Sequence, residues 1–360
     1  MRCGHCASEP GADRPFPAGV ARHGARGRHG IGVTTARDPG FIASLRTRVR
    51  GEVRADESLA RYSTYRIGGP ATVLLPAVNE DVGIALRAAV EAGIPWFAVG
   101  LGSNILLPDG GMDALVIRLG KGLDGLEREA DRWKVGAGLP APIAARRTAA
   151  AGWFGLHKFV GVPGTAGGGV YMNAGCHGAE WSDFVESVLV VDDTGTDRVW
   201  TRAEIPFGYR QSGLVGQVVL EATVRLRPEA PEVIETELAE LFKWRSDGTP
   251  FNQPCCGSVF RNPGGASWHR EGGPRTAGQL IEAAGLKGFR VGGAEISPKH
   301  ANYFVNTGDA SGADIRALIT HAQATVYAHF GAALETEVKL IRPDGGADAL
   351  PSPAYGTPHA

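Results

Sequence analysis

The chain has 360 residues, which is enough for two or three packed lobes, and a formal net charge of −1. This balance provides no overall electrostatic field for nucleic acid or an acidic membrane surface, and no apolar run approaches the roughly 20 residues that span a bilayer. Five cysteines, two of them adjacent, form an odd set that fits a reducing compartment better than a disulfide framework. We therefore expect a cytoplasmic monomer that acts on small molecules.

Both ends of the chain are predicted to be disordered. Residues 1–51 are rich in Gly, Arg, Ala and Pro without a sustained apolar period, and residues 343–360 show a similar bias toward Pro and Gly. We expect the first segment to be dispensable for folding and activity. Cys3 and Cys6 have a Cys-x-x-Cys spacing, but without a second pair they are better explained as incidental than as half a metal site. No metal is expected.

Strands alternate with helices from residue 52 to residue 229. The patterns predict, in chain order, a strand at 71–75, a helix at 80–92 capped by Asn79, strands at 96–99 and 115–118, a helix at 142–151, a hairpin of 188–192 and 198–200, and a strand at 218–227. Gly93 and Gly152 follow the two helices, as is typical of helix ends.

A change of composition near residue 230 predicts a second part. It is expected to contain a helix near 232–245, a short helix at 277–284, two strands, a long helix after Ser311 and a last strand at 334–341. The Ser-x-x-Asp sequence that starts at Ser311 is typical of a capping box. The chain as a whole is therefore predicted to have an α+β fold in two parts.

Two glycine-rich loops are candidates for binding a diphosphate. Residues 99–104 read VGLGSN, and residues 160–169 read VGVPGTAGGG. Small residues let backbone N–H groups converge on an anion, although either loop alone is equally well explained as a tight turn. The first loop is not a dinucleotide fingerprint, because no GxGxxG opens a helix there. Two loops of different design favour a diphosphate bound across both.

A third segment, TPFNQPCCGSVFRNP at residues 249–263, holds a serine in a constrained position. Ser258 follows Gly257 and precedes the apolar pair Val259 and Phe260. A hydroxyl fixed in this way suits a residue that delivers one proton to one carbon, whereas a buried serine that bonds neighbouring backbone is the commoner case. Together with the glycine loops and the late acidic sequence LETEV at 334–338, the segment suggests a flavin enzyme with a serine proton donor.

These motifs and several others occur in an order that resembles one family. The series comprises STYRIGG at 63–69, GLGSN at 100–104, VPGTAGG at 162–168 with YMNAG at 171–175, YRQS at 209–212, GSVFRNP at 257–263, LKGFRVGGAEIS at 286–297 with KHANYFVN at 299–306, and LETEV at 334–338. Over residues 52–342 the chain closely resembles the UDP-N-acetylenolpyruvoylglucosamine reductases, also called UDP-N-acetylmuramate dehydrogenases. It is similar to their shorter subtype, which lacks an extra substrate-covering insertion.

The resemblance implies a two-part FAD-binding unit of the vanillyl-alcohol-oxidase-like (PCMH-type) class, followed by an α+β substrate-binding lobe. The expected domains are residues 52–229, with subdomains of about 52–120 and 121–229, and residues 230–342. FAD is expected to be non-covalent, so His177 is interpreted as an ordinary loop residue. The residues that match the flavin-binding motifs are Arg66, Gly68, Gly69, Gly100, Gly102, Ser103, Asn104, Gly161, Gly164, Thr165, Gly168 and Asn173.

The resemblance also implies a reaction, the NADPH-dependent reduction of UDP-N-acetylglucosamine enolpyruvate to UDP-N-acetylmuramate for peptidoglycan. Ser258 matches the proton donor, and Arg210 and Glu337 match the residues that stabilise an enediolate-like intermediate. Burial is expected to raise the pKa of the Glu337 carboxyl and so to keep its proton. The residues that match the region holding the uridine-diphosphate sugar are Asn262, Lys287, His300 and Asn302.

Several alternatives remain open at this point. Alternation along the predicted last strand places Glu335 on the same face as Glu337, and Arg210 is also explained as a structural ion-pair partner. His300 is also explained as a capping residue, and Cys176, Cys255 and Cys256 are interpreted as packing residues. A flavin oxidase or dehydrogenase acting on another substrate is the second enzyme hypothesis. A ligand-binding protein without turnover is the third, although a binding protein has no use for a proton donor.

Overall fold

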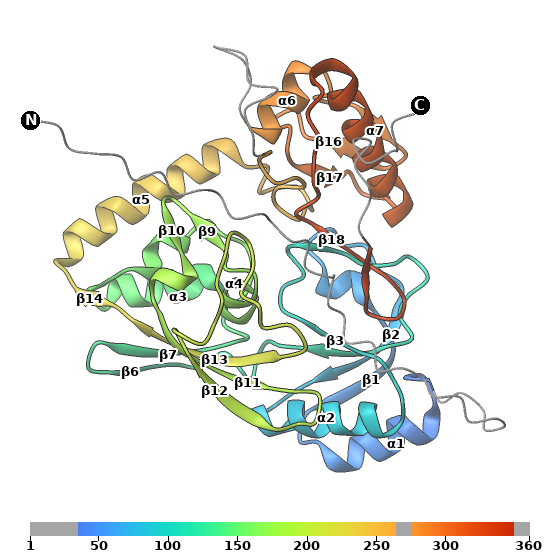
Figure 1. Ribbon diagram of the computed structural model, residues 1–360, viewed down its shortest axis with the longest axis vertical. Coiled ribbons are helices and arrows are strands. Elements are labelled where there is room, and N and C mark those ends of the chain that lie inside the picture. Colours follow the sequence, from blue (N-terminus) through green and yellow to red (C-terminus); the bar gives the residue numbers. More distant parts are fainter. Residues whose placement is uncertain (1–34, 264–275, 349–360) are drawn as a thin grey trace, which may run out of the picture.

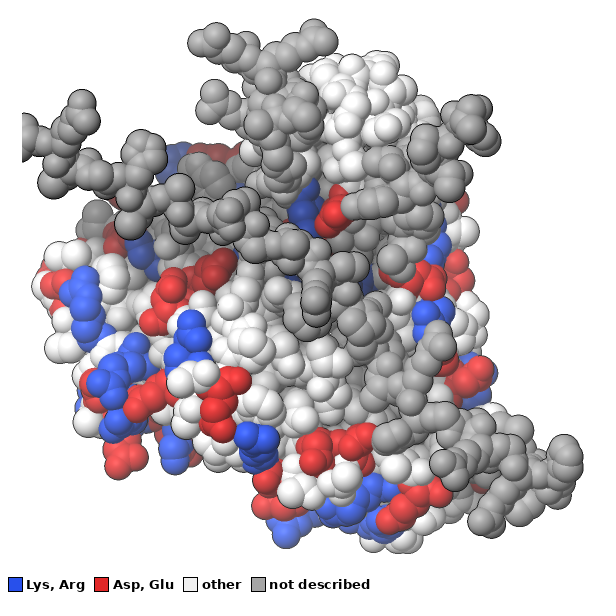
Figure 2. All heavy atoms as spheres, in the orientation of Figure 1, with Lys and Arg blue, Asp and Glu red and all other residues white. Residues whose placement is uncertain are grey.

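The computed structural model describes residues 35–263 and 276–348. Within the described residues, the two largest sheets each have helices packed on them, and a C-terminal group rich in helices follows (Figure 1). The predicted α+β class is therefore confirmed. No helix within the described ranges is long and apolar enough to cross a membrane. On the face drawn in Figure 2, basic and acidic side chains are interspersed along the left and lower edges, in keeping with the net charge of −1.

The first sheet has the order β1-β2-β5-β3. Its strands are β1 (Glu52–Ser58), β2 (Pro70–Leu75), β3 (Trp96–Val99) and β5 (Leu115–Arg118). β1 runs antiparallel to β2, and the other two pairs are parallel. Leu115 and Ile117 share a core with helix α2 (Asn79–Glu91), whereas Val116 points to the other face and packs with the short helix η1 (Leu59–Tyr62). The first glycine loop starts where β3 ends.

The start of helix α2 differs from the prediction. Val78 is the N-cap residue and Asn79 is the first helical residue, so the predicted cap at Asn79 is wrong. The buried Asp81 accepts the N–H groups of Ala77 at 2.8 Å and Arg50 at 2.7 Å. A carboxylate in the first turn thus ties the helix to the chain that leads into β1.

The expectation that residues 1–51 are disordered is wrong for the part that the structure describes. Helix α1 (Pro39–Arg48) is capped by Asp38, whose side chain accepts the N–H of Phe41 at 3.0 Å. Phe41, Ile42 and Leu45 are buried in the core that contains α2 and the first sheet. Three apolar residues in a segment rich in Gly and Arg are too weak a periodic signal to predict a helix. Residues 1–34, with Cys3 and Cys6, lie outside the described residues.

Because α1 belongs to this core, truncating its main anchor is expected to destabilise the protein. Leu45 is fully buried, so Leu45→Ala should lower the free energy of unfolding by about 2–5 kcal/mol. The matched control is Ser44→Ala on the exposed side of the same turn, which should change it by less than about 0.5 kcal/mol. Urea unfolding followed by circular dichroism measures both. A Leu45→Ala variant as stable as the control would contradict the placement of α1.

The second sheet is antiparallel throughout, in the order β12-β11-β13-β7-β6. Its strands are β6 (Leu126–Glu129), β7 (Arg132–Gly136), β11 (Val185–Val191), β12 (Asp197–Thr201) and β13 (Val218–Arg225). Helices α3 (Ala141–Ala150) and α4 (Ala166–Tyr171) lie on one side of it (Figure 1). The second glycine loop joins the short helix η2 (Leu156–Phe159) to α4. After α4 come the small hairpin of β9 (Gly175–Cys176) and β10 (Ala179–Glu180) and the short helix η3 (Trp181–Asp183).

The C-terminal group begins with helix α5 (Pro231–Gly248), after the short pair of β8 (Trp153–Phe154) and β14 (Arg227–Pro228). It continues with α6 (Ala277–Ala283), the strands β15 (Arg290–Val291), β16 (Ala294–Ile296) and β17 (Phe304–Asn306), and α7 (Gly312–Phe330). The Ser311 hydroxyl accepts the N–H of Asp314 at 3.1 Å, and the Asp314 carboxylate accepts that of Ser311 at 2.9 Å. The predicted capping box is therefore confirmed.

The end of the chain returns to the first glycine loop. β18 (Lys339–Ile341) pairs in parallel with β4 (Ile105–Leu106), which follows that loop directly, and β19 (Ala347–Asp348) pairs with β18. The predicted strand at 334–341 is thus shortened to 339–341. The predicted disorder of 343–360 is wrong for residues 343–348, and residues 349–360 lie outside the described residues. The β4–β18 pairing brings the LETEV sequence to the glycine loop.

Candidate active site

The two glycine loops lie against each other. The Ser103 hydroxyl in the first loop donates a hydrogen bond to the carbonyl oxygen of Pro163 in the second, at 3.1 Å. A Cβ atom added at Gly100 would approach the Thr165 hydroxyl to 2.5 Å, so a side chain there would force the loops apart. Gly164 lies beside Ser103 as well, since a Cβ atom there would be 3.2 Å from its hydroxyl oxygen. The structure therefore brings the predicted residues of both loops together.

Unpaired backbone donors gather where the loops meet. In the part of the chain that the structure describes, the N–H groups of Leu101, Gly102 and Ser103 have no protein acceptor. The same holds for the N–H groups of Gly164 and Thr165. Convergent N–H donors from two facing loops suit the oxygens of a diphosphate. The residues present thus fit the diphosphate of FAD.

Contacts with Tyr62 and Cys256 hold the first glycine loop in place. Gly102 has a φ of +62°, and a Cβ atom there would collide with the carbonyl oxygen of Tyr62. Sγ of the buried Cys256 lies 3.3 Å from the carbonyl oxygen of Gly102 and 3.1 Å from that of Ile105, and its single proton is shared between them. Burial raises the pKa of this thiol to about 12. Cys256 was expected only to pack, and the hydrogen bonds from it to the loop add a link to the Ser258 segment that the sequence did not reveal.

Arg210 lies in a tight turn between Gly208 and Gln211, whose backbone groups bond each other. Its φ of +57° is left-handed, which a non-glycine residue keeps only where its surroundings hold it. Asn173, predicted to contact the flavin, donates to the carbonyl oxygen of Gly208 at 3.0 Å and so supports the turn. The guanidinium Nη2 of Arg210 donates to the carbonyl oxygen of Gly175 at 3.1 Å.

Glu337 faces Arg210. The Nε atom of Arg210 donates to Oε1 of Glu337 at 3.1 Å, and the two side chains are only 20% and 18% exposed. Burial raises the pKa of the Glu337 carboxyl, and the cations of Arg210 and Arg261 oppose this without reversing it. Glu335, the alternative that alternation left open, is exposed to solvent. The carboxyl at this site is therefore that of Glu337.

Ser258 is joined to Glu337 through the backbone. The carbonyl oxygen of Val259 accepts the N–H of Glu337 at 2.7 Å, and the amide of Asn104 in the first glycine loop donates to the carbonyl oxygen of Glu337 at 3.3 Å. Within residues 35–263 and 276–348 the Ser258 hydroxyl has no hydrogen-bond partner, so its proton is available to a ligand. Of the three predicted catalytic residues, Arg210 thus comes from the loop between β12 and β13, and Ser258 and Glu337 come from the C-terminal group. Glu337 links them to the first glycine loop.

Three of the four predicted substrate-binding residues lie around α6, Asn262 and His300 near its start and Lys287 beyond its end. Asn262 accepts the N–H of Ala277 at 3.1 Å, and a Cβ atom at Gly278 would lie 3.2 Å from His300 Cε1. Lys287 forms a solvent-accessible ion pair with Glu282 at 2.7 Å. Burial lowers the pKa of the His300 imidazole, which favours its neutral form.

Asn302, the fourth of these residues, forms its hydrogen bonds within the protein. It is only 4% exposed, and its side chain bonds both backbone groups of Phe260, at 3.0 and 2.8 Å. Its own carbonyl oxygen accepts the N–H of Val259 at 2.8 Å. With its amide engaged in this way, Asn302 braces the segment that carries Ser258. Contact of its side chain with the sugar nucleotide stays a prediction.

The remaining flavin-motif residues also have identifiable places. Arg66 is exposed and has a φ of +58°, while a Cβ atom at Gly69 would collide with the carbonyl oxygen of Asp109. Gly68 has a φ of +145°, and Gly168 donates its N–H to the Thr165 hydroxyl that caps α4. The positive φ at residue 68 and the close backbone contact at residue 69 explain why glycines occur at these two positions. Contact of the residues with FAD stays a prediction.

Two arginines that the sequence did not single out lie in the site. Arg245 on α5 donates to the carbonyl oxygen of Gly161 at 3.0 Å, and its charge adds to the lowering of the His300 pKa. Arg261 opposes the rise of the Glu337 pKa, and its buried Nε has no partner among the described residues. Arg245 is one basic residue in a charged helix and carries no periodic signal, whereas Arg261 lies inside the GSVFRNP motif but no role was assigned to it.

Two family models match the chain. One, described as the C-terminal domain of UDP-N-acetylenolpyruvoylglucosamine reductase, matches residues 249–341, and one described as an FAD binding domain matches residues 70–199. A UDP-N-acetylenolpyruvoylglucosamine reductase of Halalkalibacterium halodurans is 43% identical over 84% of this chain and 98% of its own length. The enzyme of that name from Bacillus subtilis is 38% identical over 83% of this chain and 97% of its own.

A solved structure agrees with this chain in three dimensions. The UDP-N-acetylenolpyruvylglucosamine reductase of Thermus caldophilus matches with a TM-score of 0.69 and 33% identity, and the match covers 81% of this chain and 99% of that one. The predicted fold, an FAD-binding unit followed by an α+β lobe, is confirmed, and the protein is an FAD-dependent oxidoreductase. The chain belongs to the UDP-N-acetylenolpyruvoylglucosamine reductase family.

Proposed function

We propose that this protein reduces UDP-N-acetylglucosamine enolpyruvate to UDP-N-acetylmuramate, with NADPH as co-substrate and FAD as bound cofactor, in peptidoglycan precursor synthesis. The observation that carries the proposal is the meeting of Arg210, Glu337 and Ser258 beside the first glycine loop. An acid, a cation and a protonatable carboxyl at one place suit the reduction of a double bond conjugated to a carboxylate.

Arg210 and Glu337 have the chemistry to stabilise charge on the substrate carboxylate. Bound FAD would be held by the two glycine loops and would supply the hydride chemistry, passing a hydride that originates from NADPH to the terminal enolpyruvyl carbon. Negative charge then grows in the carboxylate, which a cation and a hydrogen-bond donor stabilise. Arg210 uses Nε for Glu337 and Nη2 for Gly175, which leaves Nη1 for the substrate. The raised pKa of Glu337 favours the protonated carboxyl that can donate a hydrogen bond.

Ser258 is the proposed proton donor to the neighbouring carbon. Asn302 and Glu337 hold the backbone of Val259 and Phe260, which follow Ser258, and no described residue forms a hydrogen bond with its hydroxyl. The hydroxyl is therefore fixed in place with its proton free for the substrate. Serine is a weak acid, and the basicity of the intermediate must supply much of the driving force. A positioned acid of this kind typically contributes about 10²–10⁴-fold in rate.

The activity is tested with the purified protein, NADPH and the enolpyruvyl sugar nucleotide. We expect NADPH oxidation that depends on the sugar nucleotide, with UDP-N-acetylmuramate identified by mass spectrometry. UDP-N-acetylglucosamine, which lacks the enolpyruvyl group, is the matched control and should support no turnover. NADPH oxidation driven by oxygen alone would indicate an oxidase acting on another substrate. Bound flavin without any turnover would indicate a ligand-binding protein, and either result would reject the proposal.

We further propose the residue assignments that the motifs imply. The flavin-motif residues from Arg66 to Asn173 would hold FAD non-covalently, and Asn262, Lys287, His300 and Asn302 would line the sugar-nucleotide site. The proposed domain boundary stays near residue 230, with α1 now added to the FAD-binding part. We propose that the protein is a cytoplasmic monomer. Its proposed binding partners are the two nucleotide substrates, and it is expected to bind neither nucleic acid nor membranes.

A further inference from the structure

Arg118 is a partly buried cation that forms no ion pair with any described residue. It is the last residue of β5, and burial lowers the pKa of its guanidinium. Its Nη1 donates to the carbonyl oxygen of the adjacent Leu119, whereas its buried Nε has no acceptor in the described part of the chain. No carboxylate within residues 35–263 and 276–348 forms an ion pair with it. Burying an unpaired charge is costly, so a ligand that supplies the missing anion would stabilise this arrangement.

The backbone around Arg118 touches both glycine loops. Arg118 pairs with Val99, the residue from which the first loop departs. A Cβ atom at Gly120 would lie 3.0 Å from Arg118 Nη1, and one at Gly138 would lie against the backbone of Gly120. Two residues later, Pro140 forms a bridge to Thr165 of the second loop. Arg118 therefore lies at the end of the strand beside β3, and the guanidinium lies against Gly120, whose neighbours in space connect to the second loop.

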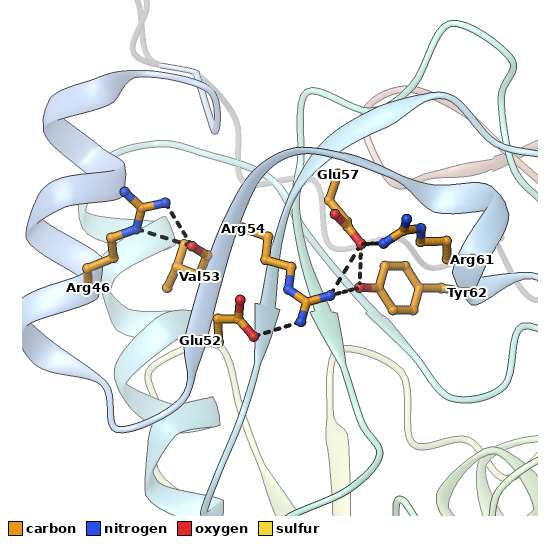
Figure 3. A network of polar contacts seen from close by, with 7 residues as sticks. All are labelled: Arg46, Glu52, Val53, Arg54, Glu57, Arg61 and Tyr62. Atoms are coloured by element: carbon orange, nitrogen blue, oxygen red, sulfur yellow. Dashed lines mark hydrogen bonds and ion pairs between the residues drawn. The ribbon is translucent and has the colours of Figure 1, made fainter.

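A network of charged side chains orients the aromatic ring that Arg118 faces. Figure 3 shows Glu57 accepting hydrogen bonds from the Tyr62 hydroxyl at 3.0 Å and from Arg61 at 3.3 Å. Arg54 contacts both Glu57 and the Tyr62 hydroxyl and also pairs with Glu52 at 2.8 Å (Figure 3). The hydroxyl is thereby fixed, and the guanidinium carbon of Arg118 lies 5.9 Å from the centre of the Tyr62 ring.

Tyr62 couples this network to the first glycine loop. Its carbonyl oxygen lies where a side chain of Gly102 would be, so the loop rests directly on its backbone. The ring faces the cation, and the Tyr62 carbonyl supports the loop that carries the N–H groups of Leu101, Gly102 and Ser103. Nη2 of Arg118 forms no hydrogen bond with a described residue and, unlike Nε, is not fully buried, so it remains as a spare charged donor beside the strand that leads into the first loop.

We propose that Arg118 is a cofactor-binding residue whose guanidinium contacts an oxygen of the adenylate half of FAD. FAD approaches this point because its diphosphate fits the adjoining loops, and the adenylate half offers phosphate and ribose oxygens as acceptors. A charge-assisted hydrogen bond would then replace the missing ion pair. The proposal depends on FAD binding and is independent of the proposed substrate, so a failure to reduce the enolpyruvyl sugar would leave it intact.

The test measures flavin release from full-length holoprotein. Dilution of Arg118→Met should release FAD, seen as free-flavin fluorescence, with a Kd about ten- to a hundredfold above that of the wild type. ADP and FMN, added as competitors, report on the two halves of the cofactor separately. The inhibition constant of ADP should rise by a similar factor, whereas that of FMN should stay within about twofold.

Arg128→Met is the matched control. Arg128 also lies over an aromatic ring, 5.3 Å from the centre of Trp153, but it is exposed on β6. Its FAD affinity should equal that of the wild type. Should Arg118→Met fail to fold, Arg118→Lys is the alternative, because it keeps the charge but lacks the planar guanidinium. The Kd of FAD and the inhibition constant of ADP should then rise by a smaller factor, and the inhibition constant of FMN should not change. Unchanged FAD affinity in the Arg118 variant would show that Arg118 only supports the fold. An equal rise in the inhibition constants of ADP and FMN would show the same.

Discussion

Ser258→Ala is expected to separate the two halves of the proposed reaction. The variant should bind FAD and be reduced by NADPH at close to the normal rate, because Ser258 has no role until hydride has reached the substrate. Reoxidation by the enolpyruvyl sugar nucleotide should be slower by about 10²–10⁴-fold. Stopped-flow absorbance of the flavin, recorded separately for each half-reaction, measures the two rates.

The structure sharpens this expectation, since the hydroxyl is not part of the scaffold. Asn302 and Glu337 hold the segment through the backbone of Val259 and Phe260, and these contacts do not involve the Ser258 side chain. Removing one half-buried oxygen atom should therefore leave the Arg210–Glu337 pair in place. The unfolding temperature of Ser258→Ala should match that of the wild type.

Glu337→Gln is the comparison for Ser258→Ala. A glutamine amide still donates a hydrogen bond to the substrate carboxylate. The rate of the second half-reaction should therefore fall less in Glu337→Gln than in Ser258→Ala. Ser187→Ala on β11 is the control and should alter neither half-reaction. If Ser258→Ala slows flavin reduction by NADPH as much as reoxidation, the serine is structural and the proposed mechanism is wrong.

The sequence predicts elements well where the signal is local. The Ser311 capping box starts α7 as expected, and β3 and β5 have the predicted bounds because each is a short apolar run beside a glycine-containing loop. The glycine loops were also identified locally, since small residues are needed wherever backbones approach each other. The segment around α1 was missed because its apolar residues are few and its composition is that of a disordered chain.

Contacts between distant segments could not be predicted in the same way. The Asn104–Glu337 hydrogen bond joins residues 233 positions apart, and the Cys256–Gly102 contact spans 154 positions. No period within one sequence reports such pairings, so bringing Ser258 and Glu337 to the first loop required the family motifs. Arg118 carries no motif at all. Its significance depends on an unpaired charge, which only the folded arrangement reveals.

Gly164→Val is expected to yield a folded protein that retains no flavin. Gly164 has a φ of +132°, and a side chain there would extend from one glycine loop toward Ser103 of the other. The N–H groups of Gly164 and Thr165, which have no protein acceptor among the described residues, would lose their alignment with the diphosphate. Loss of two hydrogen bonds to a charged group corresponds to about 3–6 kcal/mol, or roughly 10²–10⁴-fold in FAD affinity.

Gly216→Val is the control that shows whether backbone strain alone, without damage to the cofactor site, causes the loss of flavin. Gly216 also has a left-handed φ, of +74°, but no atom lies within 4 Å of an added Cβ atom. Both variants should therefore be destabilised by about 1–3 kcal/mol, while only Gly164→Val should purify colourless. The ratio of visible flavin absorbance to protein absorbance gives the FAD content, near one per chain for the wild type and Gly216→Val. Full FAD occupancy in Gly164→Val would mean that the diphosphate does not lie between the two glycine loops, and a colourless Gly216→Val would attribute flavin loss to strain.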